Sequence, residues 1–194
     1  MTGTGGDERF IDKTRVLSRL ENKQSMSRDD IERCYDEHAQ ALFAFLLNLT
    51  RNEADTRDLL QETFCRLASH PSLLDDVRNP RSFLLRLAHN LAIDLMRRRG
   101  ARETAAARLA DEPGSIFAPA ADPDQEAFRS TLAEAMGELP PDQRAVVHLK
   151  LWEGMTFEAI SELLQVPLNT AASRYRYGLD KLRDRLRPLY DEIK

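Results

Sequence analysis

The sequence has little of what metalloproteins, hydrolases, secreted proteins and membrane proteins use. It holds two cysteines and four histidines in 194 residues, and none of them stand together at the spacing of a metal site. It contains no glycine-rich phosphate loop and no nucleophile motif. No apolar run approaches the roughly 20 residues that span a bilayer, and the first residues lack the apolar core of a signal peptide. We therefore predict no catalytic residue, no metal ligand, no cofactor and a cytoplasmic protein.

The two cysteines, Cys34 and Cys65, each fall in an apolar helical pattern. Such positions favour buried free thiols over a disulfide or a metal site.

Charge is distributed unevenly along the chain. The formal net charge of −4 by itself argues against a nucleic-acid partner. However, residues 78–108 carry 8 basic and 2 acidic side chains, and residues 169–187 carry 6 basic and 2 acidic ones. Between them, residues 109–142 carry 1 basic and 8 acidic side chains. Two basic patches flank an acidic segment, which is compatible with two separate contacts to nucleic acid.

Apolar residues recur at helical spacing through most of the chain, and no alternating run predicts a strand. We expect helices over about 29–50, from 53 to before Pro71, over 80–99, 126–136 and 141–151, and a helical hairpin over 156–187. Ser27, Asn52, Asn79 and Thr156 are the expected N-caps. The segment between the two groups of helices is rich in alanine, proline and acidic residues, as linkers often are.

The predicted fold is all-α, with two small helical domains joined by a flexible acidic linker. The C-terminal domain is a helix-turn-helix. The expected boundaries are a flexible N-terminal extension over 1–27, in which Met26 could be the natural start, a helical domain over 28–104, the linker over 105–124, and a helix-turn-helix domain over 125–190.

The hairpin over 156–187 has the parts of a DNA-binding helix-turn-helix. Val166-Pro167 interrupts the first helix, and Asn169 is the expected N-cap of the second. The second helix has an apolar stripe and an opposite face that is basic and aromatic: Ser173, Arg174, Arg176, Tyr177, Lys181, Arg183 and Arg185. A short turn followed by such a helix is typical of major-groove recognition. The alternative is an ordinary helical hairpin with a solvated basic face.

The helix over 80–99 carries a second polar face. Asn90, Asp94, Arg97 and Arg98 recur at spacings of three and four. The simplest interpretation is a solvated face with an Asp94–Arg98 pair. Asparagine is a mediocre helix former whose amide can bond base edges, so a nucleic-acid contact stays open.

Three strings of residues resemble bacterial RNA polymerase sigma factors of the extracytoplasmic-function (ECF), sigma-70-like group. DLLQETFCRL at 58–67 resembles the group's D-x-x-Q-E-x-F string, and SFLLRLAHNLAIDLMRRR at 82–99 is similar to W-L-x-R-I-A-x-N-x-x-x-D-x-x-R. Residues 138–183 resemble the group's C-terminal domain, L-P-x-x-x-R followed by T-V-K-S-R-x-x-R-A. The resemblance covers about residues 28–187 in the right order.

The resemblance implies a protein that binds core RNA polymerase and directs promoter-specific initiation, without catalysis of its own. Its implied partners are core polymerase, a duplex −35 element, a single-stranded −10 element and an anti-sigma factor, and the free protein would be a monomer. The implied polymerase contacts are Asp58, Leu59, Gln61, Glu62 and Phe64. The loop from Asp75 to Ser82 would capture −10 bases together with Asn90, Asp94, Arg97 and Arg98. The implied −35 contacts are Lys150, Thr170, Ser173, Arg174, Arg176 and Tyr177.

The sequence departs from the family pattern at three places. Phe83 stands where tryptophan is usual, which keeps an aromatic anchor. Ala172 stands where the family usually has a lysine or arginine. Tyr177 stands where arginine is common, and an arginine, Arg176, occupies the preceding position. One lost phosphate contact would lower the salt dependence of DNA binding by about one unit, so we expect an altered −35 preference or weaker binding.

Two other functions are compatible with the residues. A two-domain helix-turn-helix regulator would bind an operator without being a polymerase subunit, usually as a dimer. A sigma mimic that titrates another regulator would keep the polymerase strip and need no base contacts. The Asp58 to Phe64 string favours the sigma factor.

Overall fold

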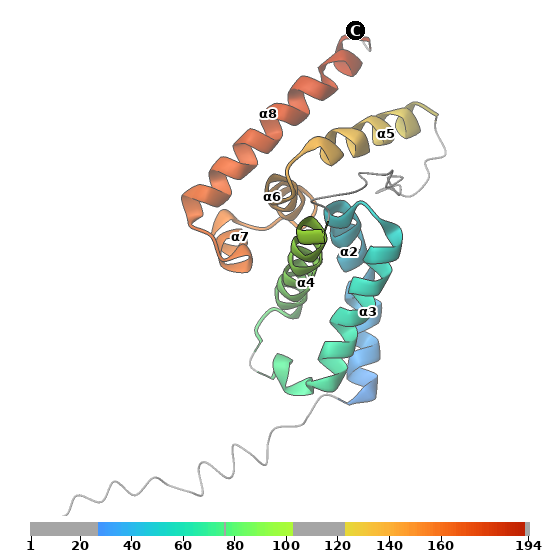
Figure 1. The fold of residues 1–194 in the computed structure, drawn as a ribbon, viewed down its shortest axis with the longest axis vertical. Coiled ribbons are helices and arrows are strands. Elements are labelled where there is room, and N and C mark those ends of the chain that lie inside the picture. Colours follow the sequence, from blue (N-terminus) through green and yellow to red (C-terminus); the bar gives the residue numbers. More distant parts are fainter. Residues whose placement is uncertain (1–26, 76, 103–122, 193–194) are drawn as a thin grey trace, which may run out of the picture.

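The computed structural model describes residues 27–75, 77–102 and 123–192, and every regular element in these ranges is a helix (Figure 1). The first group comprises α2 (Arg28–Thr50), α3 (Glu53–Ser69), the short 3₁₀ helix η1 (Pro71–Leu74) and α4 (Pro80–Arg102). The second comprises α5 (Pro123–Glu138), α6 (Pro141–Leu151), α7 (Phe157–Leu164) and α8 (Leu168–Glu192). The all-α prediction is confirmed. The predicted N-terminal extension and acidic linker lie almost entirely outside the described residues, and α5 begins just inside the segment assigned to the linker.

Local capping explains where most helices begin. Ser27 and Asp30 form a reciprocal capping box at the start of α2. The side chains of Asn52, Asn79 and Thr156 each accept a hydrogen bond from the backbone N–H three residues ahead, at 2.9, 3.0 and 3.2 Å. Each bond satisfies a donor that the helix itself leaves unpaired, and each confirms a predicted cap.

The start of α8 differs from the prediction. The helix begins at Leu168, and the carbonyl of Pro167 accepts from the N–H groups of Thr170 and Ala171 at 2.9 and 3.1 Å. Asn169 therefore lies inside the first turn, and its assignment as the N-cap is wrong. Gln165 ends α7 in the left-handed region at φ 55°, and only residues 165–167 separate α7 from α8, a short turn as predicted.

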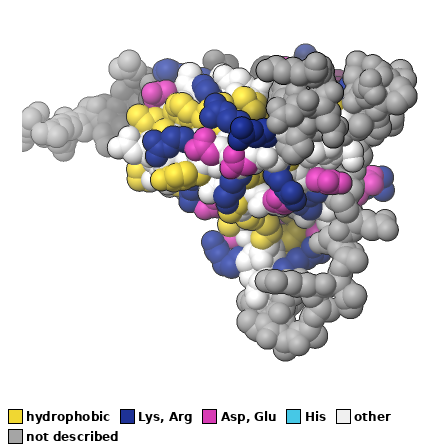
Figure 2. All heavy atoms as spheres, turned by 90° about the horizontal axis from the view of Figure 1, so that it is seen from above, with side chains coloured by type: hydrophobic (Ala, Val, Ile, Leu, Met, Phe, Trp, Pro, Cys, Tyr) yellow, Lys and Arg dark blue, Asp and Glu magenta, His cyan; other side chains and the backbone are white. Residues whose placement is uncertain are grey.

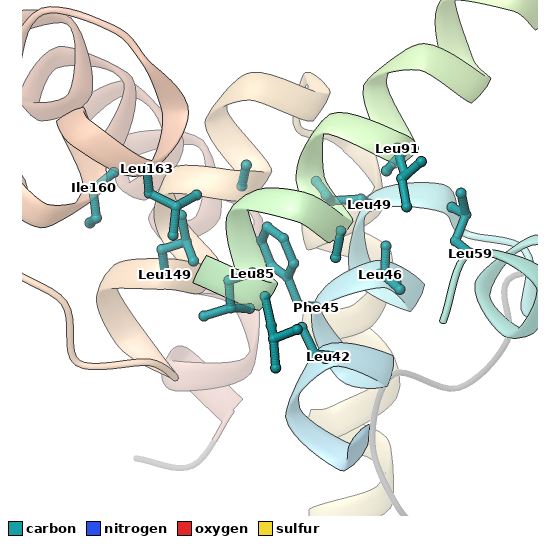
Figure 3. Packing of buried hydrophobic residues seen from close by; sticks show 14 of the residues in the cluster. Leu42, Phe45, Leu46, Leu49, Leu59, Leu85, Leu91, Leu149, Ile160 and Leu163 are labelled. Atoms are coloured by element: carbon teal, nitrogen blue, oxygen red, sulfur yellow. The ribbon is translucent and has the colours of Figure 1, made fainter. Parts of the chain in front are cut away.

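One cluster of buried side chains joins the two groups of helices (Figure 3). Phe45 of α2 and Leu85 of α4 belong to it together with Leu149 of α6 and Ile160 and Leu163 of α7. A smaller cluster ties α5 to α6 and α8: Ala135, Met136, Leu139, Val147 and Leu182. The helical groups that the sequence predicts as separate domains thus share a core in this structure.

Gly178 allows α6 and α8 to approach closely. A Cβ at this position would lie 2.7 Å from Cγ2 of Val147, a separation that packed atoms do not tolerate. The absence of a side chain therefore sets how tightly these helices pack.

Arg144 of α6 links the ends of two other helices. Its Nη1 donates to the carbonyls of Asn48 and Leu49, at the end of α2, at 3.0 and 3.3 Å. Its Nη2 donates to the carbonyl of Gly137, in the last turn of α5, and to that of Leu139, which follows α5, at 2.9 and 2.7 Å. These carbonyls lack partners within their own helices and carry partial negative charge. Burial, and then the nearby charge of Arg51, lowers the pKa of Arg144 to about 10, which leaves the guanidinium charged at neutral pH.

A second buried contact joins α2 to α6. Asn48 Nδ2 lies 3.0 Å from His148 Nδ1, and the His148 ring lies 5.3 Å from the Phe45 ring, centroid to centroid. Burial lowers the pKa of His148 to about 4, against a smaller opposing effect of Glu153. At neutral pH the ring is therefore uncharged, which avoids the cost of burying a charge beside Phe45.

Candidate nucleic-acid interface

The strip predicted to bind polymerase lies on α3. Asp58, Gln61 and Glu62 are exposed, and Glu62 forms an ion pair with Arg66 one turn further on at 2.7 Å. Leu59 is buried with 7% of its surface exposed, so it supports the strip from inside. The structure thus divides the predicted residues into an exposed polar row and its apolar support, and their role in docking stays a prediction.

An apolar hollow of about 710 Å³ lies beside this strip, between α2 and α3. Phe64 and Tyr35 line it with ring centroids 4.8 Å apart, and Tyr35 is 46% exposed. Sequence reasoning missed Tyr35, although an aromatic residue beside acidic neighbours on α2 was a signal. Cys65 lines the same hollow and is exposed, so its prediction as a buried thiol is wrong. Cys34 is buried as predicted, and burial raises its pKa.

The predicted −10 residues share one exposed face of α4. Asn90, Asp94, Arg97 and Arg98 are all exposed. Arg97 lies 3.5 Å from the Asp94 carboxylate, whereas Arg98 Nε donates to the Asp94 carbonyl at 3.2 Å. The predicted Asp94–Arg98 pair is therefore a bond to the backbone. Such exposed contacts contribute little free energy, so both arginines can exchange them for phosphates.

Arg99, the next residue, has a different role. It forms a two-point ion pair with Asp55 of α3, in which Nη2 donates to Oδ1 at 2.6 Å. The Asp55 side chain is only 11% exposed. Arg99 therefore holds α4 to α3 and is not free for nucleic acid.

The loop before α4 faces the first helix of the helix-turn-helix. Asn79, Ser82 and Phe83 line a hollow of about 350 Å³ together with Met155 and Glu162. At its edge, Arg81 Nε donates to Glu153 Oε2 at 2.6 Å, and the Glu153 side chain is 4% exposed. The predicted −10 loop and the helix-turn-helix thus share one hollow.

Two of the basic residues predicted to contact the −35 element, Lys150 and Arg174, are engaged by other parts of the fold. Lys150 Nζ donates to the carbonyl of Met155 at 2.9 Å and lies 4.9 Å from the Phe157 ring centroid. Arg174 is half-buried and forms an ion pair with Asp142 of α6. Each of these hydrogen bonds uses one donor of the side chain and holds it within the fold.

The other predicted −35 residues lie on the accessible side of α8. Arg176 and Tyr177 are exposed, and the Arg176 guanidinium lies 5.2 Å from the Tyr177 ring centroid. Thr170, Ser173 and Arg176 line a hollow of about 540 Å³ at the start of α8, together with Asn169 and Ala172. Sequence reasoning missed Asn169 for this site because it assigned the side chain to a cap.

Charges of opposite sign are interspersed on the surface. Figure 2 shows Lys and Arg side chains beside Asp and Glu side chains on one face of the molecule. In the described part of the chain, no helix is both long and apolar enough to cross a membrane. Within the same residues, no three His, Cys, Asp or Glu side chains gather as metal ligands.

Comparisons with known proteins agree with this arrangement. The sigma-70 region 2 family matches residues 34–102, and the sigma-70 region 4 family matches residues 129–182. The ECF RNA polymerase sigma factor SigL of Mycobacterium tuberculosis is 32% identical over 157 residues, which are 80% of this chain and 88% of that protein. The chain belongs to the ECF sigma factors.

Two further relatives extend the comparison for this sigma factor. RNA polymerase sigma factor CarQ of Myxococcus xanthus is 29% identical over 174 residues, 90% of this chain and 99% of that protein. The sigma factor RpoE of Bartonella quintana, solved in complex with the anti-sigma factor NepR, has the same fold. Its TM-score is 0.64 at 21% identity, over 81% of this chain and 97% of that chain.

The region 2 match contains the α3 strip and the α4 face, and the region 4 match contains the hollow at the start of α8. Residues of both matched regions belong to the shared core of this sigma factor.

Proposed function

We propose that this sigma factor binds core RNA polymerase and directs promoter-specific transcription initiation through two helical bodies. Residues 28–104 act as the region 2-like body, residues 125–190 as the region 4-like body, and residues 105–124 connect them. The observation that carries the proposal is the match of both sigma regions in one chain, each with an exposed polar helix face inside it.

The region 2-like body takes the −10 element as a single strand. The loop before α4 and Asn90 hold unstacked bases, while Arg97 and Arg98 hold the backbone and Asp94 positions them. A flipped base needs a pocket with polar groups, and nearby positive charge holds the strand while the duplex opens. The exposure of these side chains and their weak ion pairs support this assignment.

The region 4-like body contacts the −35 element as a duplex. Thr170, Ser173, Arg176 and Tyr177 of α8 face the major groove. Lys150 and Arg174 exchange Met155 and Asp142 for DNA phosphates. The hollow at the start of α8 supports this placement, because the beginning of the second helix is the part of a helix-turn-helix that meets base edges.

The polymerase binds on the α3 side. Asp58, Gln61 and Glu62 supply polar contacts, Leu59 supports them from the core, and Phe64 contributes the wall of the neighbouring hollow. An exposed polar row beside an apolar hollow matches the composition of a specific protein interface.

The remaining proposals concern partners and place of action. The protein acts without a reaction of its own, in the cytoplasm, and the free protein is a monomer. An anti-sigma factor is its expected inhibitor, as NepR is a partner of RpoE in the related crystal structure.

Transcription in vitro tests the proposal. Purified protein and core polymerase are incubated with genomic fragments, and RNA 5′ ends are mapped. We expect discrete start sites that core polymerase alone does not produce. Fragment binding without polymerase and without initiation would identify an operator-binding regulator instead. Inhibition of another regulator without initiation, unchanged by Arg174→Ala and Arg176→Ala, would identify a sigma mimic.

A further inference from the structure

We propose that Asn169 recognises an adenine of the −35 element. The inference rests on the proposed function and adds a specificity-determining residue to it. It follows from the position of Asn169, from the free state of its amide and from the side chains around it.

Asn169 lies in the first turn of α8, because Pro167 and not Asn169 provides the first accepting group of the helix. Its side chain is exposed. Within the described residues, the Asn169 amide makes no hydrogen bond, in contrast to Asn52 and Asn79, whose side chains accept from the backbone. The amide therefore keeps its donor and its acceptor available.

The neighbours of Asn169 form one recognition face. Ser173 and Arg176 follow at four and seven residues, so the three side chains lie along one side of the helix. They line the 540 Å³ hollow together with Thr170 and Ala172. Ala172 is small and leaves room beside the amide, where the family usually has a long basic side chain.

The other candidates in this region are less free to recognise a base. Arg174 is bound to Asp142, and Lys150 is bound to the carbonyl of Met155. The Ser173 hydroxyl donates to the carbonyl of Thr170 at 3.0 Å and so offers only its acceptor. Asn169 thus has a free donor and a free acceptor in the first turn of α8, the part of the helix that we propose enters the major groove.

This combination matches adenine. In the major groove adenine presents the N7 acceptor and the N6 donor, and an asparagine amide can bond both at once. Guanine presents two acceptors, which suit arginine, and cytosine presents a donor, which suits a carboxylate. We therefore assign adenine to Asn169 and leave guanine to Arg176.

The test is in vitro transcription from a template library randomised in the −35 element, with core polymerase and the full-length chain. The variants are Asn169→Ala and Asn169→Asp. The aspartate keeps the length of the side chain and suits the first turn of a helix, where negative charge is favourable, so this variant should fold. We expect the wild-type protein to prefer adenine at one position by roughly 5- to 150-fold. Asn169→Ala removes that preference, and Asn169→Asp changes it toward cytosine.

Asp184→Ala is the matched control, because Asp184 is exposed on the same helix outside the hollow. It should preserve the base preference at every position. The inference is overturned if both Asn169 variants keep the wild-type preference. It is also overturned if they lower output by the same factor on all templates, which would show a contact to the DNA backbone and not to a base. A wild-type protein that initiates on no template would overturn the proposed function itself.

Discussion

Arg144 shows how one side chain can connect several helices through hydrogen bonds to their backbone. Its guanidinium donates to four backbone carbonyls at the ends of α2 and α5. In the sequence, Arg144 is visible only as the last letter of a family string. Its two partners in α2 lie 96 and 95 residues away, so no local pattern could predict them.

Replacing Arg144 should destabilise the whole fold. Arg144→Met leaves buried carbonyls without donors, and we expect the free energy of unfolding to fall by about 1–3 kcal/mol. Arg144→Lys should recover only part of this loss, because an ammonium cannot reach four carbonyls in a planar arrangement. Urea unfolding followed by circular dichroism measures both. Arg183→Met is the control, since Arg183 is exposed and should change the stability by less than about 0.5 kcal/mol. Equal losses in all three variants would contradict the role of Arg144.

His148 should make stability depend on pH. Its pKa is about 4 in the folded protein, and the ordinary value is 6.5. Between these values the unfolded chain binds more protons, so stability should fall as pH decreases from about 6.5 to about 4, by up to about 3 kcal/mol. Burial also lowers the pKa of His89, which adds to the effect in the same direction. Denaturant unfolding at pH 7 and pH 5 measures the difference. His148→Gln should reduce it, and an unchanged pH dependence in this variant would exclude His148 as the cause.

At the scale of single elements, the sequence predicted much of the structure. Ser27, Asn52 and Thr156 cap helices as expected, because capping depends on a few consecutive residues. Asn169 failed as a cap for an equally local reason, since the carbonyl of Pro167 had already begun the helix. Lys150 and Arg174 show the limit of this approach. The family resemblance predicts them as DNA contacts, but it could not show that Met155 and Asp142 already engage them.

The α3 strip gives a prediction for this scale. Asp58→Ala with Gln61→Ala removes two exposed polar side chains and no core contact. We expect at least a tenfold loss of core polymerase binding, because the few residues that carry most of the binding energy of an interface each cost about 2 kcal/mol or more when truncated, and we place Asp58 and Gln61 among them. The circular dichroism spectrum should be unchanged. Pull-down of core polymerase measures the loss, and Asp180→Ala in α8 is the control. Unchanged recovery of polymerase with the double variant would remove α3 from the interface.

At the scale of the whole molecule, the sequence predicted two bodies but not their contact. The sequences of α6 and α7 each show an apolar stripe. The spacing of these residues does not tell which other helix covers the stripe. In the structure, Leu149, Ile160 and Leu163 join Phe45 in one core. An ion pair between Arg81 and Glu153 also links the two bodies.

This contact conflicts with simultaneous binding to both promoter elements. The centres of elements at −10 and −35 lie about 85 Å apart along B-form DNA at 3.4 Å per base pair. In the structure, the loop before α4 shares a hollow with α7. If each body holds the element proposed for it, the two bodies must separate first.

A cross-link tests this separation. Arg81→Cys and Glu153→Cys are introduced in a Cys65→Ser background, because Cys65 is exposed and Cys34 is buried. A short bismaleimide linker with a cleavable disulfide then joins the two positions. We expect initiation to fall more than tenfold after cross-linking and to return when the linker is cleaved. The control is the same linker between Asp180→Cys and Arg183→Cys within α8, which should leave initiation intact. Full activity of the first cross-linked protein would show that the bodies need not part.

The Asn48–His148 contact has a consequence for how much polymerase the protein can recruit. If only the separated form binds productively, its apparent affinity is the intrinsic affinity multiplied by the separated fraction. Each 1.4 kcal/mol of additional stability in the contact would then raise the polymerase concentration required for half-saturation about tenfold. Residues that touch neither promoter nor polymerase would thereby set the threshold at which this protein competes for a limited pool of enzyme.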